Sequence, residues 1–330
     1  MGKSIKKNKY FLFVCLVIVA FLAMIIAVGC SNQQPNQSSS VKTNYVVSIW
    51  GINHDGDNTI TFGPAIGNDK SCLEHDGHHQ HCLAHDSWDE IISNIKAGHA
   101  DYYADCLKEG CTHTVELNLN GTIKGERASD NSKESVLYDS IAEKYLKWNY
   151  NYSGSEKDFN YADWSKCRMR ATLNGKTDQD PKYAGPDCLD SNNCLFSCFP
   201  DVLKNSIKEK AYKVPIEWNT SNPYTITNEK EIKDKLWLPN ATEVFNFPTQ
   251  SNSFGDYGKQ YEKCTLNGIT ATNAKANQAY NENGYPYNRW LRSPLRSYFY
   301  HAAITAGTGG NCSSFMIHNP IVGISPFFIL

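Results

Sequence analysis

Residues 45–62 read YVVSIWGINHDGDNTITF and contain two β-rich segments near the start of the folded part of this 330-residue chain. Tyr45–Trp50 and Thr59–Phe62 are rich in β-branched and aromatic residues, which favour strands. The polar residues 53–58 between them are typical of a turn. The stretch therefore predicts two strands joined by a turn.

The segments that follow carry both helix and strand signals. Residues 87–90 (SWDE) have the pattern of a capping box and predict a helix that Gly98 ends. Residues 112–118 alternate polar and apolar side chains, as a half-buried strand does, and Asn120-Gly121 predicts a hairpin turn. Apolar side chains on one face predict a further helix over residues 135–148.

The second half of the chain has weaker signals. Residues 168–173 are interpreted as a short strand in a polar loop region, and residues 199–212 as a helix. Asn240 is predicted to cap a short helix at residues 241–245. A few helices followed by short irregular strands, without a fixed-period repeat, predict an α+β fold.

The first thirty residues are organised like a signal sequence. Four lysines precede an apolar run at residues 10–28, and the ending Ala27-Val28-Gly29-Cys30 resembles the lipobox of bacterial lipoproteins. This resemblance implies that the peptide before Cys30 is removed and that Cys30 is lipidated on the extracytoplasmic face of the cell membrane. An uncleaved signal anchor is the alternative, because the run at about 1.5 Å per residue approaches the thickness of a bilayer core.

The predicted domain organisation follows from this N-terminus. Residues 1–29 are a signal peptide, and residues 30–43 are a lipid-anchored flexible tether too polar to bury apolar surface. Residues 44–330 form the extracytoplasmic α+β domain, with a candidate sub-boundary near residues 213–232. A formal net charge of −2 and the lack of a basic stripe argue against nucleic-acid binding.

The cysteines provide a second expectation. The chain has 12 cysteines, and 12 − 2 = 10 remain when Cys15 and Cys30 are set aside. An even number outside the cytoplasm favours disulfides that stabilise the domain, with thiols or metal ligands as the alternative. The predicted pairs are Cys72–Cys82, Cys106–Cys111, Cys194–Cys198, Cys167–Cys188 and Cys264–Cys312.

Two motif groups resemble a known family. They are SIWGINHD (residues 48–55) with TFGPA (residues 61–65), and WLRSP (residues 290–294) with a Gly-x-x-Pro ending at residues 323–326. Together they resemble a domain of unknown function, of the type numbered 6273, in surface proteins of gut-associated Firmicutes. The segment NCLFSCFP at residues 193–200 also fits that group.

The motif order of this family is similar to that of the C-type-lectin-like superfamily, which includes formylglycine-generating enzymes. The resemblance implies a C-type-lectin-like C-terminal part with short irregular strands and a few flanking helices. Ser325 stands where that superfamily has a terminal arginine, so a pairing role for that arginine does not carry over.

Aromatic side chains surround the second motif. The candidate ligand-binding residues are Tyr285, Tyr287, Trp290, Arg292, Tyr298 and Tyr300. Aromatic faces beside an arginine suit sugar rings or peptide surfaces. Core packing is the alternative for this cluster, and Arg292 can hold loops together by donating to neighbouring carbonyls or to a carboxylate.

Residues 74–86 form the densest group of possible metal ligands. His75, His78, His79, His81 and His85 could ligate zinc, but their spacing matches no zinc signature and a solvated loop is the alternative. The turn residues 55–58 (DGDN) offer oxygen ligands for calcium without the spacing of an EF-hand.

The sequence as a whole favours a surface-exposed, membrane-anchored lipoprotein with a non-catalytic binding or adhesion module. The expected partners are the membrane and a glycan or protein ligand, without a cofactor, and the ligand is not a nucleic acid. The alternative is an extracytoplasmic enzyme that is metal-dependent or formylglycine-generating-like. No unambiguous reactive cysteine pair or nucleophile site supports that alternative.

Overall fold

The computed structural model describes residues 41–67, 69, 80–119, 163–175, 191–219, 225–247, 257–271, 273, 277–278, 288–295, 301–305, 310–316 and 322–330. Ser40–Leu330 forms one compact unit. Helices and sheets are both present, so the predicted α+β class is confirmed. In the described ranges no helix has the length and apolar character needed to cross a membrane.

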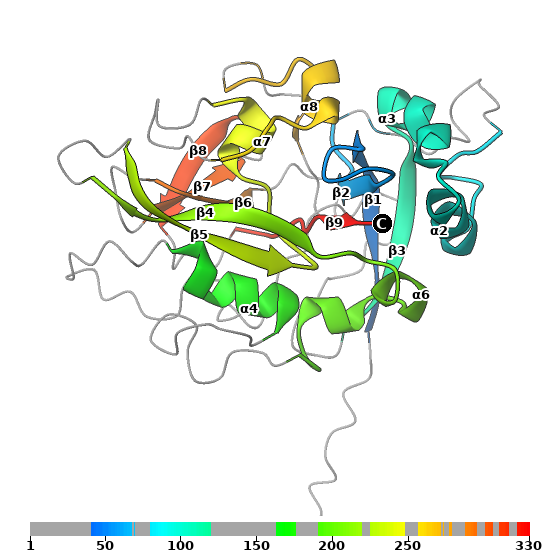
Figure 1. Ribbon diagram of the computed structural model, residues 1–330, viewed down its shortest axis with the longest axis horizontal. Coiled ribbons are helices and arrows are strands. Elements are labelled where there is room, and N and C mark those ends of the chain that lie inside the picture. The colour runs from blue at the N-terminus through cyan, green and yellow to red at the C-terminus, as the bar shows by residue number, and fades with distance from the viewer. Residues whose placement is uncertain are drawn as a thin grey trace, which may run out of the picture. The chain divides into compact units, whose positions relative to one another are not determined.

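A four-stranded antiparallel sheet, in the order β3-β1-β2-β9, contains the N-terminal strands (Figure 1). β1 (Val41–Ile52) and β2 (Ile60–Pro64) confirm the two strands predicted within residues 45–62. β3 (Thr112–Leu119) confirms the strand predicted at residues 112–118. β1 begins earlier than predicted because β3 pairs with it over residues 41–48.

The last residues of the chain complete this sheet. β9 (Phe328–Ile329) pairs with β2, and the rings of Phe62 and Phe328 stack with centroids 5.2 Å apart. The hydroxyl of Tyr45 donates to the carbonyl of Pro326 at 2.8 Å. Ring packing and pairing therefore hold a strand that is too short to predict from its own sequence.

Three helical segments follow β2 along the chain and lie beside β3 (Figure 1). α2 (Trp88–Lys96) has the predicted capping box between Ser87 and Glu90, and Gly98, at φ +92°, lies just past its end. η2 (Ala100–Tyr103) and α3 (Ala104–Glu109) follow. The three isoleucines of α2 are buried, so this amphipathic helix places its apolar face against the core.

The middle of the chain corrects two predictions. η4 (Trp164–Lys166) leads into α4 (Arg168–Asn174), a helix where a strand was predicted at residues 168–173. The helical conformation buries Met169 and Leu173 and brings Arg170 Nε to 2.9 Å from Asp234 Oδ1. These tertiary contacts outweigh the weak local preference of the segment.

The helix predicted over residues 199–212 is also wrong beyond its first turn. η5 (Leu195–Cys198) and α6 (Asp201–Lys204) are short. β4 (Lys210–Trp218) then pairs antiparallel with β5 (Ile226–Asp234), and this pairing draws the end of the predicted helix into a strand. The β4–β5 pair spans the residues considered as a sub-boundary.

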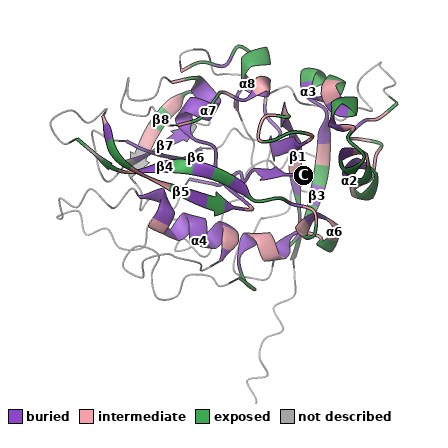
Figure 2. Cartoon of the chain, viewed as in Figure 1, coloured by how far each residue is buried: buried purple, intermediate pink, exposed green. Residues whose placement is uncertain are grey.

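The remaining described elements are two helices and a third antiparallel sheet. α7 (Ala241–Phe245) confirms the predicted cap at Asn240, and α8 (Glu262–Leu266) follows. β6 (Arg289–Pro294), β7 (His301–Thr305) and β8 (Cys312–Met316) form the sheet in that order. Every residue of β6 is buried, in keeping with the purple interior strands of Figure 2.

The cysteines correct the disulfide prediction. Seven described cysteines are thiols: Cys106, Cys111, Cys167, Cys194, Cys198, Cys264 and Cys312. This contradicts the pairs Cys106–Cys111, Cys194–Cys198, Cys264–Cys312 and Cys167–Cys188. The pair Cys72–Cys82 stays a prediction, because Cys72 lies outside the described residues.

The surroundings of Cys198 and Cys111 explain why these two cysteines are thiols in this fold. Cys198 donates to the backbone carbonyl of Cys194, with Sγ and O 3.6 Å apart, rather than bonding its sulfur. A hydrogen bond with Cys106 and burial raise the pKa of Cys111, which keeps it protonated. Buried cysteines of this kind act as small apolar side chains.

Candidate functional site

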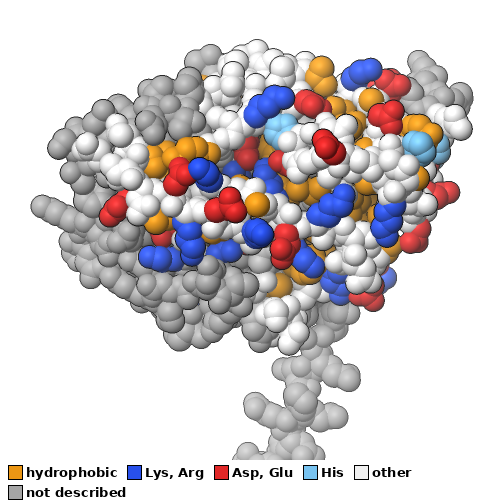
Figure 3. Space-filling model, in the orientation of Figure 1, with side chains coloured by type: hydrophobic (Ala, Val, Ile, Leu, Met, Phe, Trp, Pro, Cys, Tyr) orange, Lys and Arg blue, Asp and Glu red, His pale blue; other side chains and the backbone are white. Residues whose placement is uncertain are grey.

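A polar pocket of about 280 Å³ lies between the β1–β2 turn, β4, α7 and β6. Its lining includes His54, Asp55, Lys210, Tyr212, Glu243, Tyr257, Lys259 and Arg292. The pocket thus joins the two predicted motif groups, since His54 and Asp55 belong to SIWGINHD and Arg292 to WLRSP. Figure 3 shows acidic and basic side chains intermixed among the described residues on the face of the molecule that it draws.

The floor of the polar pocket is a network of paired charges. Lys210 Nζ lies 2.8 Å from Asp55 Oδ1 and 3.1 Å from Glu243 Oε1, and it also donates to the hydroxyl of Tyr261 at 3.1 Å. Arg292 donates from Nη2 to Glu243 Oε1 at 2.8 Å and from Nη1 to the carbonyl of Leu238 at 2.5 Å. Two cations and two carboxylates therefore neutralise one another, and the prediction that Arg292 donates to a carbonyl or a carboxylate is confirmed.

Glu243 is held from two sides. Its Oε2 accepts the backbone N–H of Asn240 at 2.9 Å, which completes the capping box of α7. Burial opposes the ionisation of this carboxyl, but the charges of Arg292 and Lys210 outweigh it and set the pKa of Glu243 at about 2. The carboxylate is consequently charged at neutral pH and fixed in orientation.

A hydrogen bond to Asp55 and the close approach of Gly258 to Glu243 constrain the backbone around the polar pocket. Thr61 donates its hydroxyl to Asp55 Oδ2 at 2.6 Å, so the turn between β1 and β2 is tied to β2. Gly258 has φ +128°, and a Cβ there would lie 2.9 Å from Cγ of Glu243. Only glycine lets the wall of the pocket approach the buried glutamate this closely.

Aromatic rings form the walls of the polar pocket. His54 packs on Tyr261 with ring centroids 4.5 Å apart, and burial lowers the pKa of His54 below its ordinary 6.5. Tyr212 lies 4.4 Å from the guanidinium of Arg292, and its hydroxyl donates to Asp234 at 2.6 Å. The pair between Arg170 and Asp234 therefore anchors this wall from α4.

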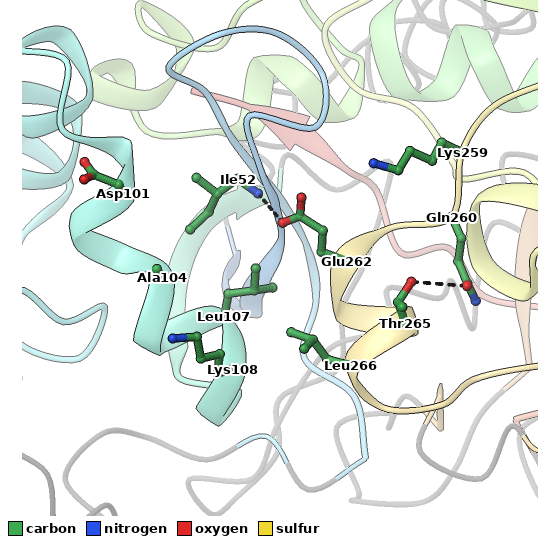
Figure 4. A pocket seen from close by; sticks show the side chains of 10 residues that line it. All are labelled: Ile52, Asp101, Ala104, Leu107, Lys108, Lys259, Gln260, Glu262, Thr265 and Leu266. Carbon is green, nitrogen blue, oxygen red and sulfur yellow. Dashed lines mark hydrogen bonds between the residues drawn. The ribbon is translucent and has the colours of Figure 1, made fainter.

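A second, apolar cavity of about 410 Å³ lies between α3 and α8 (Figure 4). Ile52, Leu107 and Leu266 provide apolar side chains, with Asp101, Lys108 and Lys259 at its edge. Glu262 closes its inner side by accepting the backbone N–H of Ile52 at 3.2 Å. Leu266 is 57% exposed, which is unusual for a large aliphatic side chain among the described residues.

The two cavities are neighbours in the fold. Lys259 lines both of them, and Ile52 of the apolar cavity precedes His54 of the polar pocket by two residues. The segment Tyr257–Gln260 therefore forms a wall with a polar side and an apolar side. This arrangement can hold a ligand that has both characters.

Of the six predicted ligand-binding residues, the structure describes Trp290 and Arg292. Trp290 is buried in the core, and Arg292 is buried at the base of the polar pocket. The other four candidates, Tyr285, Tyr287, Tyr298 and Tyr300, lie outside the described residues.

The structure describes two of the five histidines that were predicted as metal ligands. His75, His78 and His79 lie outside the described residues, whereas His81 and His85 lie within them. The calcium interpretation of the turn at residues 55–58 does not fit, because the ammonium of Lys210 takes the position beside Asp55 that a cation would need.

Sequence reasoning missed Lys210, Glu243, Tyr257 and Lys259. Lys210 was placed in a predicted helix, although the alternation in KAYKVPIEW (residues 210–218) is a usable strand signal. Glu243 is the third residue after Asn240, so a search for complete capping boxes would have found it. Tyr257 and Lys259 carry no pattern that points to a site.

Comparison with known proteins places part of the pocket in a family. Residues 131–330 match the family described as a domain of unknown function (DUF6273). The chain belongs to this family. No curated protein and no solved structure matches the chain. Lys210, Glu243 and Arg292 lie inside the DUF6273 match, while His54 and Asp55 come from the β1–β2 turn, which precedes it in the chain.

Proposed function

We propose that this member of the DUF6273 family is a lipid-anchored, extracytoplasmic binding protein whose two cavities hold a glycan with an apolar substituent. The observation that carries the proposal is the shared wall at Tyr257–Gln260, with a polar, aromatic-walled pocket on one side and an apolar cavity on the other. A sugar ring suits the polar pocket, because aromatic faces and fixed hydrogen-bonding groups recognise sugars.

The charges of the polar pocket support binding without catalysis. A general acid or base works best with a pKa near the operating pH, whereas Glu243 has a pKa of about 2 and both its oxygens accept hydrogen bonds. Asp55 is similarly committed to Lys210 and Thr61. The described lining of this pocket also contains no serine, threonine or cysteine that could act as a nucleophile.

The proposed cellular address rests on the N-terminal sequence. The lysines, the apolar run at residues 10–28 and Cys30 fit a lipoprotein signal. A C-type-lectin-like C-terminal part belongs to the same proposal and rests on the order of the motifs around WLRSP. A surface lipoprotein of this kind would meet glycans or proteins outside the cell.

Ligand binding is tested with the full chain in lipid nanodiscs. Calorimetric titration with methyl and phenyl glycosides of glucose, galactose, mannose and N-acetylglucosamine should show one preferred sugar, bound more tightly as its phenyl glycoside. Tyr257→Ala should weaken both forms of that sugar. Tyr102→Ala is the matched control, because Tyr102 is exposed and lines neither cavity. No binding, or equal loss in the two variants, would reject the proposed glycan function.

The anchor has a separate test. Metabolic labelling with radioactive palmitate in a bacterial host should label the wild-type chain and the Cys15→Ser variant, and should not label the Cys30→Ser variant. Label that persists in Cys30→Ser would contradict lipidation at this cysteine.

A further inference from the structure

A cluster of polar side chains outside both cavities surrounds His81. His81 Nδ1 lies 3.2 Å from Asp86 Oδ2, and Tyr103 donates its hydroxyl to the same oxygen at 2.7 Å. Asn94 in turn donates to the hydroxyl of Tyr103 at 3.0 Å. This network connects the residues before α2 with α2 itself and with η2.

The network sets the orientation of the imidazole. Asp86 is only 13% exposed, and Tyr103 is fully buried, so the carboxylate has little freedom to turn. A charge-assisted bond from Nδ1–H of His81 to this carboxylate is stronger than a bond from the neutral amide of Asn94. It places the proton on Nδ1 and leaves Nε2 with its lone pair.

The ring is also held from one face. Tyr102 stacks on His81 with centroids 4.8 Å apart and an interplanar angle of 6°. Tyr102 also stacks on His99, with ring centroids 4.5 Å apart. The plane of the imidazole is thus fixed although the side chain of His81 is 27% exposed.

Nε2 of His81 has no hydrogen-bond partner among the described residues, and the ring borders a cavity of about 360 Å³. The cavity is lined by Gln80, His81, Asp86, Glu90, Ser93 and Asn94. Glu90 uses Oε2 for the capping box with Ser87, at 2.7 and 2.8 Å. Its other oxygen, Oε1, is not used in the cap. The side chains of His81 and Glu90 line this same cavity.

We propose that this cavity binds a zinc ion, with His81 Nε2 and Glu90 Oε1 as protein ligands and water completing the coordination. Histidines that ligate metals usually donate their other ring N–H to a carboxylate, which fixes the tautomer and raises the basicity of the ligand. Asp86 is in that position, and it acts as a positioning residue. Nitrogen and carboxylate oxygen are ligands that zinc accepts. The inference is independent of the proposed glycan site.

Zinc titration of the full chain in lipid nanodiscs, in competition with a chromophoric chelator, tests the site. His81→Ala should remove the tightest site. Asp86→Asn keeps the shape of the side chain but removes its charge, and it should weaken binding by about 10–100-fold. Glu90→Gln should also weaken zinc binding while it preserves the capping box, since glutamine serves in that role.

His85→Ala is the matched control, because His85 is exposed, lies four residues along the chain and does not line the cavity. It should bind zinc as tightly as the wild-type chain. Equal zinc binding by the wild-type chain and His81→Ala, or equal losses in His81→Ala and His85→Ala, would overturn the proposal.

A further variant separates zinc ligation by His81 from its structural role in the hydrogen-bond network with Asp86. His81→Gln can still donate to Asp86, so it should melt at the wild-type temperature without zinc and lack the rise in melting temperature that zinc gives the wild-type chain. A zinc-dependent rise in melting temperature of the same size in His81→Gln would show that His81 has a structural role only and does not ligate zinc.

Discussion

The two cavities on either side of Lys259 are built in opposite ways. The polar pocket rests on four buried charged groups that are paired with one another, whereas the apolar cavity is lined by Ile52, Leu107 and Leu266 and leaves Leu266 more than half exposed. The first arrangement is sensitive to the loss of any one member, because a buried charge without its partner is costly. The second tolerates change, because an exposed aliphatic group contributes little to folding.

The difference teaches where stability and recognition lie in this fold. The ion pairs below the polar pocket connect β4, α7 and β6, so these charged side chains stabilise the fold. Tyr257 and the exposed Leu266 line the cavities without belonging to this ion-pair network. The following variants can break or sharpen this contrast.

The largest expected effect comes from Glu243→Ala. This change leaves Lys210 and Arg292 without their shared carboxylate and should cost about 3–5 kcal/mol of unfolding free energy. Chemical denaturation of the detergent-solubilised chain measures it. The control is Glu229→Ala, which breaks the solvent-exposed ion pair with Lys213 and should change the unfolding free energy far less, because water and salt screen exposed charges. Similar losses in the two variants would remove the contrast between the pocket floor and the surface.

A fall in pH should weaken the ion pairs that Glu243 makes with Lys210 and Arg292. The pKa of Glu243 is depressed from an ordinary 4.5 to about 2, so its contribution to stability is complete above pH 4.5 and is lost as the pH falls toward 2. Melting temperatures measured across this window should fall more steeply for the wild-type chain than for Glu243→Gln, which has no such proton to bind. Parallel profiles would show that the ion pairs do not stabilise the fold.

Gly258→Ala should have a smaller effect on the wall between the cavities. The new Cβ would meet Cγ of Glu243 at 2.9 Å in a left-handed backbone, and a loss of about 1–3 kcal/mol is expected. Gly98→Ala also places alanine at positive φ, but nothing lies within 4 Å of its Cβ. The difference between the two melting temperatures therefore isolates the crowding of Glu243, and equal shifts would exclude it.

The smallest effect on stability is expected for Leu266→Ala. Leu266 is 57% exposed, so unfolding free energy should change by no more than about 0.5 kcal/mol. The advantage of phenyl over methyl glycosides should nevertheless shrink in calorimetric titration, because the apolar cavity loses one of its main walls. An unchanged advantage would separate the apolar cavity from the proposed ligand.

Local signals in the sequence were sufficient for several elements. The strands at residues 45–50, 59–62 and 112–118 follow from β-branched content and alternation, and the helices after Ser87 and Asn240 follow from their caps. These features involve neighbouring residues only. The helix predicted at residues 135–148 and the turn at Asn120 lie outside the described residues and stay predictions.

Other features depend on partners that are distant in the chain. The strand and helix predicted in the middle of the chain were wrong, because contacts of Arg170 with Asp234 and of β4 with β5 outweigh local preference there. The disulfide prediction rested on an even count, but sulfur atoms bond only when the fold brings them together in the required geometry.

By itself, the sequence determined the α+β class, the membership of the DUF6273 family, and the elements whose strand alternation or helix caps are local. Tertiary structure alone decided that Asp55, Lys210, Glu243 and Arg292 meet, that β9 completes the first sheet, and that Lys259 separates two cavities. The physical reason is the separation in sequence between the residues that interact. Caps and alternation act over a few residues, whereas the hydrogen bond from Tyr45 to Pro326 joins positions 281 residues apart, and no local pattern encodes such a contact.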